Sequence, residues 1–271
     1  MHMDVRDLRE FYYQTRLGRS AQRALQGAIG SLWPETRGMI VAGYGFAAPV
    51  LRPFLRESKA VVSLMPAQQG VMAWPAGADN LCTLVEETGW PIEAGILDRI
   101  VLLHGLETCE SPDALLDEIW RVLAPGGRVL FVVPNRSGLW AQRDATPFGY
   151  GRPYSIGQLE TQLESNRFVA ERHTTALYAP PSHRRFWHQT AHFWEGYGRR
   201  FRPLFGAGAL VVEASKQVFA RPESRRSKLA VRGPLDMLEG LAGPSHEPVP
   251  GRGRIVAKSP GAEAFSGPGR R

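Results

Sequence analysis

Short apolar runs, each about the length of one strand, recur along the chain and are separated by glycine, proline or charged residues. Five of them lie in its first half, at residues 38–45, 59–65, 80–85, 98–104 and 128–133. Continuous apolar runs rich in Val, Ile and Leu are typical of strands buried on both faces of a parallel sheet. Residues 168–178 and 209–216 predict further strands, so we expect about seven.

Helical patterns lie between these strands, so that strands and helices alternate throughout. An amphipathic pattern covers residues 4–27, and further helices are predicted at 49–56, 111–122, 155–166 and 184–197. The sequence Pro125-Gly126-Gly127 predicts a tight turn directly before the fifth run. The alternation predicts an α/β fold, namely a doubly wound, mostly parallel sheet with helices on both faces and ligands bound beyond the carboxyl ends of the strands.

We divide the chain into three regions. Residues 1–37 form a predicted N-terminal helical cap, residues 38–220 the α/β domain with an aromatic helical insertion near 180–206, and residues 221–271 a tail rich in Gly, Pro and Arg. The tail carries ten Lys and Arg against five Asp and Glu, which is most of the net charge of +7. Its composition predicts a flexible segment. Because the rest of the chain is nearly neutral, we do not expect a nucleic-acid partner.

The overall composition is that of a globular protein, with 43% hydrophobic and 22% charged residues. No apolar run reaches the roughly 18 residues of a membrane helix, and residues 1–9 mix charges where a signal peptide has an apolar core. We therefore expect a cytoplasmic protein without a membrane span. Cys82 and Cys109 are too few for a disulfide framework and are predicted to be buried thiols.

A glycine turn follows the first apolar run, with Gly43, Tyr44 and Gly45 between the strand and the next helix. Small residues at such a turn let a ligand approach the backbone, and the helix N-terminus that follows favours negative charge. Glycine also serves tight turns that bind nothing. The turn by itself leaves both interpretations open.

A more specific pattern follows the third run. It consists of Asp98-Arg-Ile-Val-Leu-Leu-His-Gly-Leu-Glu107 and then Glu118-Ile-Trp-Arg-Val-Leu-Ala-Pro-Gly-Gly-Arg-Val-Leu130. The order and spacing resemble the type 11 class I methyltransferases, over residues 38–134. The resemblance implies a Rossmann-like fold and S-adenosylmethionine as the cofactor.

In that family the methionine end of the cofactor lies over the glycine turn, the ribose meets an acid after the second strand, and the adenine meets an acid before the fourth. Here Val41 stands where an acid is usual before the turn, and Ala47 replaces its last glycine. The family's Val-Asp-Leu-Ser-Pro pattern is replaced by Val62-Ser63-Leu64-Met65-Pro66, so a serine takes the place of the ribose-binding carboxylate. A neutral acceptor forms weaker hydrogen bonds than a charged one, so we expect cofactor binding to be unusual, weak or absent.

Glu86 matches the adenine-binding acid, although Glu86 and Glu87 also fit a solvated loop. The residues that the resemblance assigns to the cofactor are Gly43, Tyr44, Gly45, Ser63, Leu64, Met65, Glu86 and His104.

Candidate acid and base residues follow the fourth run. Methyl transfer requires in-line positioning above all, with a general base when the acceptor must lose a proton. His104 and Glu107 are the natural candidates; alternatively, His104 caps the following loop and Glu107 opens a helix. The loop 143–154, rich in glycine and aromatic residues, is either a lid over the cleft or a structural loop. The candidate acceptor-binding residues are Asn135, Arg136 and Tyr154.

An aromatic and basic segment occupies residues 184–205. Its composition suits the core of an interface with a protein partner, and packing over the sheet is the alternative. His188 and His192 have the spacing of metal ligands, but Gln189 stands where the zinc protease motif needs a glutamate, so no metal is predicted.

Three functions are consistent with these patterns. The first is an S-adenosylmethionine-dependent methyltransferase that acts on a small molecule or a protein. The second is a catalytically silent subunit of the same fold that binds or regulates a protein partner, as the missing acids at positions 41 and 63 indicate. Nucleic-acid binding through the basic tail is the third and the least expected.

Overall fold

The computed structural model describes residues 3–142, 146–181 and 206–217. All of these residues lie in the first of two compact units, Met1–Arg221, and the second unit is Pro222–Arg271. The predicted flexible tail and the aromatic segment 184–205, with its histidine pair, lie outside the described residues. Within the described ranges, no helix is both long enough and apolar enough to cross a membrane.

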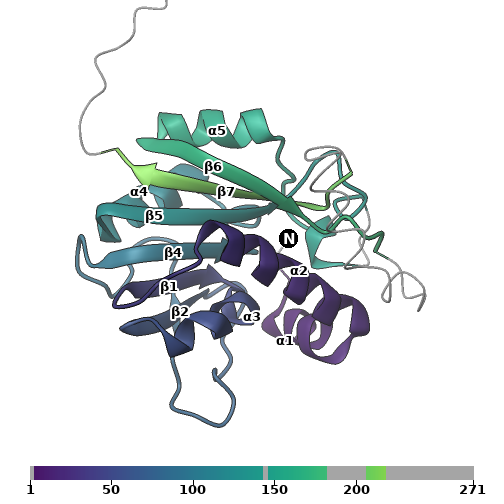
Figure 1. Cartoon of the computed structure of the whole chain (residues 1–271), viewed down its shortest axis with the longest axis horizontal. Helices are drawn as coiled ribbons and strands as arrows, with labels where there is room; N and C mark the ends of the chain where they lie inside the picture. Colours follow the sequence, from purple (N-terminus) through teal and green to yellow (C-terminus); the bar gives the residue numbers. More distant parts are fainter. Residues whose placement is uncertain (1–2, 143–145, 182–205, 218–271) are drawn as a thin grey trace, which may run out of the picture. The chain divides into compact units, whose positions relative to one another are not determined.

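A seven-stranded sheet forms the centre of the first unit, in the order β3-β2-β1-β4-β5-β7-β6 (Figure 1). Its strands are β1 Ile40–Gly45, β2 Ala60–Pro66, β3 Cys82–Val85, β4 Leu97–Leu103, β5 Leu123–Pro134, β6 Phe168–Ala176 and β7 Ala209–Lys216. The first five pair in parallel, and β7 runs antiparallel to β5 and β6. The strand order reverses between β1 and β4, and doubly wound sheets bind ligands at the carboxyl ends beside such a reversal. The predicted mostly parallel fold is confirmed.

Helices cover both faces of this sheet. The segments are α1 Val5–Arg9, η1 Glu10–Gln14, α2 Arg16–Leu32, α3 Ala48–Leu51, η2 Arg52–Arg56, α4 Pro112–Val122, η3 Pro147–Gly149 and α5 Ile156–Ser165. Successive residues of β4 belong to different apolar clusters, with Val101 packed among residues of α2 and α3 and Leu102 among residues of α4 and α5. Because successive strand residues point to opposite faces, these two helix pairs lie on opposite sides of the sheet.

Two crossovers contain no helix, which corrects the prediction that strands and helices alternate throughout. Residues 67–81, between β2 and β3, and residues 86–96, between β3 and β4, form turns and irregular backbone. The first crossover contains Gly70, Pro75 and Gly77 within eight residues, and these residue types disfavour a continuous helix. The face beside β2 and β3 therefore lacks the covering helix that the pattern predicted.

The region around Gly126 is also different from the prediction. β5 begins at Leu123, so the Pro125-Gly126-Gly127 sequence lies inside the strand and not before it. Leu97 pairs with Leu123 and Arg99 with Arg128, so the residues between them form an irregularity in the β4–β5 pairing. Gly126 has φ +77, a conformation that glycine adopts without steric cost. Residues 168–176 form one continuous strand, β6.

A buried carboxylate fastens the end of α2 to the sheet. Glu213 on β7 is fully buried and accepts hydrogen bonds from Trp33 Nε1 at 2.8 Å and Arg172 Nε at 2.5 Å. Arg128 Nη1 lies 3.3 Å from the same carboxylate, and Arg172 also donates to the Leu32 carbonyl. Burial raises the pKa of Glu213, but the hydrogen bonds from Arg172 and Trp33 lower it by more than burial raises it. The pKa of Glu213 therefore lies below its usual value. The carboxylate is therefore ionised at neutral pH.

We expect Glu213→Gln to lower the free energy of unfolding at pH 7 by about 1–3 kcal/mol, because it replaces a charge-assisted acceptor with a neutral one. Glu213 has a depressed pKa in the folded state, so its contribution is complete above the unfolded value of about 4.3 and decreases as the pH falls below it. Urea unfolding from pH 7 to pH 3 measures this difference. A constant difference across that range would contradict it, and the exposed Glu164→Gln is the control.

The N-terminal segment before α2 is held in place by a glycine. η1 is a π-helix, and the Thr15 hydroxyl that follows it donates to the Phe11 carbonyl at 2.7 Å and accepts from the Gly18 amide at 2.8 Å. A Cβ atom on Gly18 would fall on the Phe11 carbonyl and the Tyr12 Cα. Only glycine therefore lets α2 begin this close to η1.

Two glycine substitutions in α2 should have opposite effects. Gly18→Ala forces η1 away from α2 and should lower the free energy of unfolding by about 1–3 kcal/mol, the usual cost of overpacking. Gly27→Ala places its methyl group in open space and should raise it by up to about 1 kcal/mol through helix propensity. Denaturant unfolding of both variants tests this. Equal effects of the two substitutions would show that η1 is not clamped at Gly18.

Candidate active site

His104 is the residue on which the predicted site converges. It follows β4 directly, its backbone has the left-handed φ of 53°, and its side chain is buried. The Tyr12 hydroxyl lies 2.8 Å from Nε2, and Glu107 Oε1 lies 3.1 Å from Nδ1. The ring of Phe148 packs edge-on against the imidazole, with 4.8 Å between ring centroids. The two predicted acid/base residues are thus adjacent.

The hydrogen bonds define the tautomer of neutral His104. A carboxylate only accepts, so Nδ1 carries the hydrogen toward Glu107, and Nε2 accepts from the Tyr12 hydroxyl. Burial raises the pKa of Tyr12 well above its usual value, and the charge of Glu107 raises it further, so the hydroxyl keeps its proton. The result is a buried chain of donors from Tyr12 through His104 to Glu107.

The structure decides one of the alternative roles, namely whether Glu107 opens the following helix. α4 begins at Pro112, so Glu107 does not open that helix. The carboxylate before α4 belongs to Glu87, which accepts from the amides of Glu110 and Ser111. Glu107 Oε2 is buried without a hydrogen-bond partner among the described residues. Since a buried carboxylate oxygen without a donor is costly, this atom is suited to a ligand or a water.

Gln69 is a site residue that the sequence interpretation missed. It lies three residues after β2, is buried, and donates through Nε2 to the His104 carbonyl. Its Oε1 atom is buried and has no hydrogen-bond partner among the described residues. The turn that follows the second strand, with glycine at position 70, was the available sequence signal, because it returns the chain toward the carboxyl ends of the sheet.

Internal packing accounts for both glycines of the turn after β1. A Cβ atom on Gly43 would meet the side chains of Leu51 and Ala47, and one on Gly45 would fall on the Leu103 carbonyl. Gly45 also has φ +79, which favours glycine. Tyr12 and Phe46, both fully buried, stack on each other beside His104. The protein's own atoms therefore fill the space at this turn.

The other residues assigned to the cofactor around this turn are buried in the sheet. Ser63 lies inside β2, paired with Gly43 of β1 and Cys82 of β3, and its hydroxyl is buried without a hydrogen-bond partner among the described residues. Tyr44 stacks on Trp90, with 4.9 Å between ring centroids. Leu64 and Met65 are fully buried. Glu86, in contrast, is exposed just after β3.

The candidate acceptor residues lie beyond β5. Asn135 is buried and donates to the Ala207 carbonyl at 2.9 Å, which indicates a structural role. Arg136 is exposed, and its amide donates to the Tyr154 carbonyl. Tyr154 is largely buried. Its burial, and after it the charges of Cys109 and Glu107, raise its pKa to about 12. The described part of the 143–154 loop covers the His104–Glu107 pair. Phe148 touches His104, and the Arg152 amide donates to the Glu107 carbonyl.

The strand order and the antiparallel β7 define a class I, Rossmann-like methyltransferase fold. A sequence profile of the methyltransferase domain family matches residues 42–194, which is more than half of the chain. This protein belongs to that family. A search of curated protein sequences finds no match.

Solved structures agree on the fold. An S-adenosylmethionine-dependent methyltransferase from Thermotoga maritima, described as a possible histamine N-methyltransferase, has a TM-score of 0.54 at 16% identity, over 79% of this chain and 95% of its own. A Haloferax volcanii protein assigned as a methyltransferase, solved with an activator protein, has a TM-score of 0.51 at 13% identity, over 78% of this chain and 93% of its own. At these identities the likeness establishes the fold alone.

Membership in this family supports S-adenosylmethionine as the cofactor. The cofactor positions at the glycine turn, however, are closely packed by other described residues. Gly43 and Gly45 are enclosed by protein atoms, and Ser63 is buried inside the sheet. Among the described residues, buried polar atoms without hydrogen-bond partners include Gln69 Oε1 and Glu107 Oε2 next to His104, and also the hydroxyl oxygens of Tyr44 and Ser63 at the cofactor positions.

The hydrogen-bond chain predicts an observable tautomer. At alkaline pH, we expect neutral His104 to carry its proton on Nδ1, because Glu107 accepts it there. Two-bond proton–nitrogen correlation spectra measure the tautomer, and His104→Gln assigns the signal. Tyr12→Phe should keep this tautomer and lower the free energy of unfolding by about 1 kcal/mol, the value of one lost hydrogen bond. A proton on Nε2 would contradict the chain.

Proposed function

We propose that this protein is an S-adenosylmethionine-dependent methyltransferase that acts on a small molecule or a protein, with His104 as the general base. The single observation that supports this role most strongly is the buried His104–Glu107 pair at the carboxyl end of β4. In the fold class of this chain, ligands bind at that end of the sheet.

The geometry of the pair fits proton abstraction. Glu107 holds Nδ1–H and stabilises the imidazolium that forms when Nε2 accepts a proton from the acceptor. In the arrangement described, Nε2 is bonded to Tyr12, so the Tyr12 side chain must leave before an acceptor can reach it. Displacing Tyr12 breaks this hydrogen bond, worth about 1 kcal/mol, and exposes a fully buried ring, worth about 1.5–3 kcal/mol more, so bound ligands must offset both.

Gln69 is the residue that we propose in place of the missing ribose-binding acid. Its Oε1 is a buried acceptor without a partner, and the residue follows β2, as that acid does in the family. An amide accepts hydrogen bonds from hydroxyl groups, though less strongly than a carboxylate. This role predicts cofactor affinity below that of enzymes that retain the acid.

Titration with S-adenosylhomocysteine, the demethylated cofactor, tests the function without knowledge of the acceptor. We expect saturable binding to the full chain. Binding to Gln69→Leu should be about fivefold to tenfold weaker, because the loss of one neutral hydrogen bond costs about 1–1.4 kcal/mol. Gln68→Leu is a matched control, because Gln68 is the exposed neighbour of the buried Gln69. Equal affinities of the two variants would show that Gln69 does not contact the cofactor. No heat at millimolar ligand would rule out the proposed function.

A second candidate function rests on the filled turn after β1. A methyltransferase-fold subunit without cofactor would need no open space there, and Val41 and Ser63 leave the usual acids absent. Such a chain would bind or regulate a protein partner. Transfer of labelled methyl groups from S-adenosylmethionine by the isolated chain would rule it out.

A further inference from the structure

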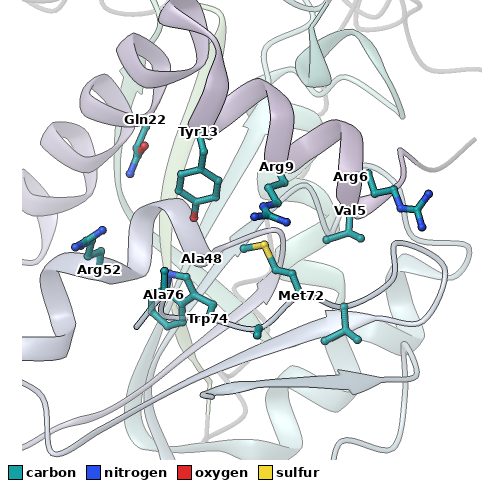
Figure 2. A pocket seen from close by; sticks show the side chains of 12 residues that line it. Val5, Arg6, Arg9, Tyr13, Gln22, Ala48, Arg52, Met72, Trp74 and Ala76 are labelled. Carbon is teal, nitrogen blue, oxygen red and sulfur yellow. The ribbon is translucent and has the colours of Figure 1, made fainter. Parts of the chain in front are cut away.

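The missing helix between β2 and β3 leaves a groove on the face of the N-terminal segment. Its volume is about 630 Å³, within the usual range for small-molecule sites. The groove lies between α1 and η1 on one side and residues 71–76 of the crossover on the other, with α3 and η2 at one end (Figure 2). None of the residues assigned to the cofactor lines it, so it is separate from the site at His104.

Three arginines give this groove its charge. Arg6, Arg9 and Arg52 line it, and no Asp or Glu is among the lining residues. Their guanidinium groups form no ion pair or hydrogen bond with the described part of the chain. Figure 2 shows Arg9 extending from α1 toward Met72, and Arg52 at the other end beyond Trp74. Unpaired cations that share one groove repel each other, and a bound anion relieves that repulsion.

Apolar and aromatic side chains form the rest of the lining. Tyr13 reaches from η1 toward Met72 and Trp74 of the crossover (Figure 2), and Val71 also lines the groove. Val71 is 46% exposed. The Tyr13 hydroxyl is buried without a hydrogen-bond partner among the described residues. Burial raises the pKa of Tyr13 to about 12, while the positive charges of Arg52 and Arg9 oppose that rise.

We propose that this groove binds a soluble amphipathic anion, a small molecule with a carboxylate or phosphate group on an apolar body. The Tyr13 hydroxyl donates to the charged group, the positive charges of Arg9 and Arg52 attract it from the two ends of the groove, and Met72 and Trp74 contact the apolar body. S-adenosylmethionine does not match this lining, because its sulfonium would lie among arginines with no carboxylate nearby. The tail of this chain does not match it either, because residues 221–271 carry an excess of positive charge.

Calorimetric titration of the full chain with octyl phosphate tests the proposal. Inorganic phosphate has the charge without the apolar body, and octyltrimethylammonium has the body with the opposite charge. We expect saturable binding of octyl phosphate, at least tenfold tighter than that of either control ligand. Equal binding of octyltrimethylammonium would overturn the proposal, because it would show a purely apolar site.

Substitutions locate the binding. Arg9→Gln and Arg52→Gln should each weaken the binding of octyl phosphate by about tenfold, since each removes a positive charge that attracts the anion. Arg23→Gln is the matched control, because Arg23 is an exposed arginine of α2 that does not line the groove. Met72→Glu should abolish binding by placing a negative charge beside Arg9 in the groove. The side chains of Arg9, Arg23 and Arg52 are exposed, so the melting temperatures of these three variants should be unchanged, which would confirm that they are folded.

Three outcomes would overturn the assignment. The first is equal weakening by Arg9→Gln and Arg23→Gln, which would mean attraction by net charge alone. The second is displacement of octyl phosphate by S-adenosylhomocysteine, which would make the groove part of the cofactor site. The third is sedimentation with phosphatidylcholine vesicles containing phosphatidate while octyl phosphate fails to bind, which would assign the arginines to a lipid surface.

Discussion

The position of His104 is the constraint on which the rest of the site depends. Its left-handed backbone, at a cost of the order of 1–3 kcal/mol for a residue other than glycine, turns the chain sharply at the end of β4. The turn places its carbonyl against Gln69 and its ring between Tyr12 and Glu107. The N-terminal segment, the β2–β3 crossover and the loop carrying Phe148 therefore all meet the sheet at one residue.

The N-terminal segment reaches His104 because it is fixed at two points. At the end of α2, Trp33 and the Leu32 carbonyl are bound through the Glu213 network to β6 and β7. At the start of α2, Gly18 lets η1 approach closely enough to fix Tyr12. π-Helical turns are frequent at functional sites, and here the turn carries Tyr12 toward His104 and Tyr13 toward the arginine-lined groove. One short segment thus contacts both candidate binding sites.

The glycine turn shows why a motif and a site are different things. Gly43 and Gly45 are explained by contacts with Leu51, Ala47 and the Leu103 carbonyl, whether or not a ligand binds. Glycine after the first strand is therefore a requirement of this fold before it is a requirement of the cofactor. Buried polar atoms without partners are a second signal, because burying an acceptor without a donor costs free energy that packing does not return. Such atoms lie on Gln69 and Glu107 beside His104, and also on Tyr44 of β1 and Ser63 of β2.

The sequence determined the strands, most helices and the adjacency of His104 and Glu107, because apolar periodicity and a spacing of three residues act locally. It also carried the family resemblance between residues 38 and 134. Only the tertiary structure decided that Tyr12, 92 positions from His104, closes the hydrogen-bond chain, that Gln69 joins it, and that two crossovers lack helices. These features depend on contacts between distant segments, and a residue's partners across a fold are set by the packing of whole elements, which no local pattern encodes.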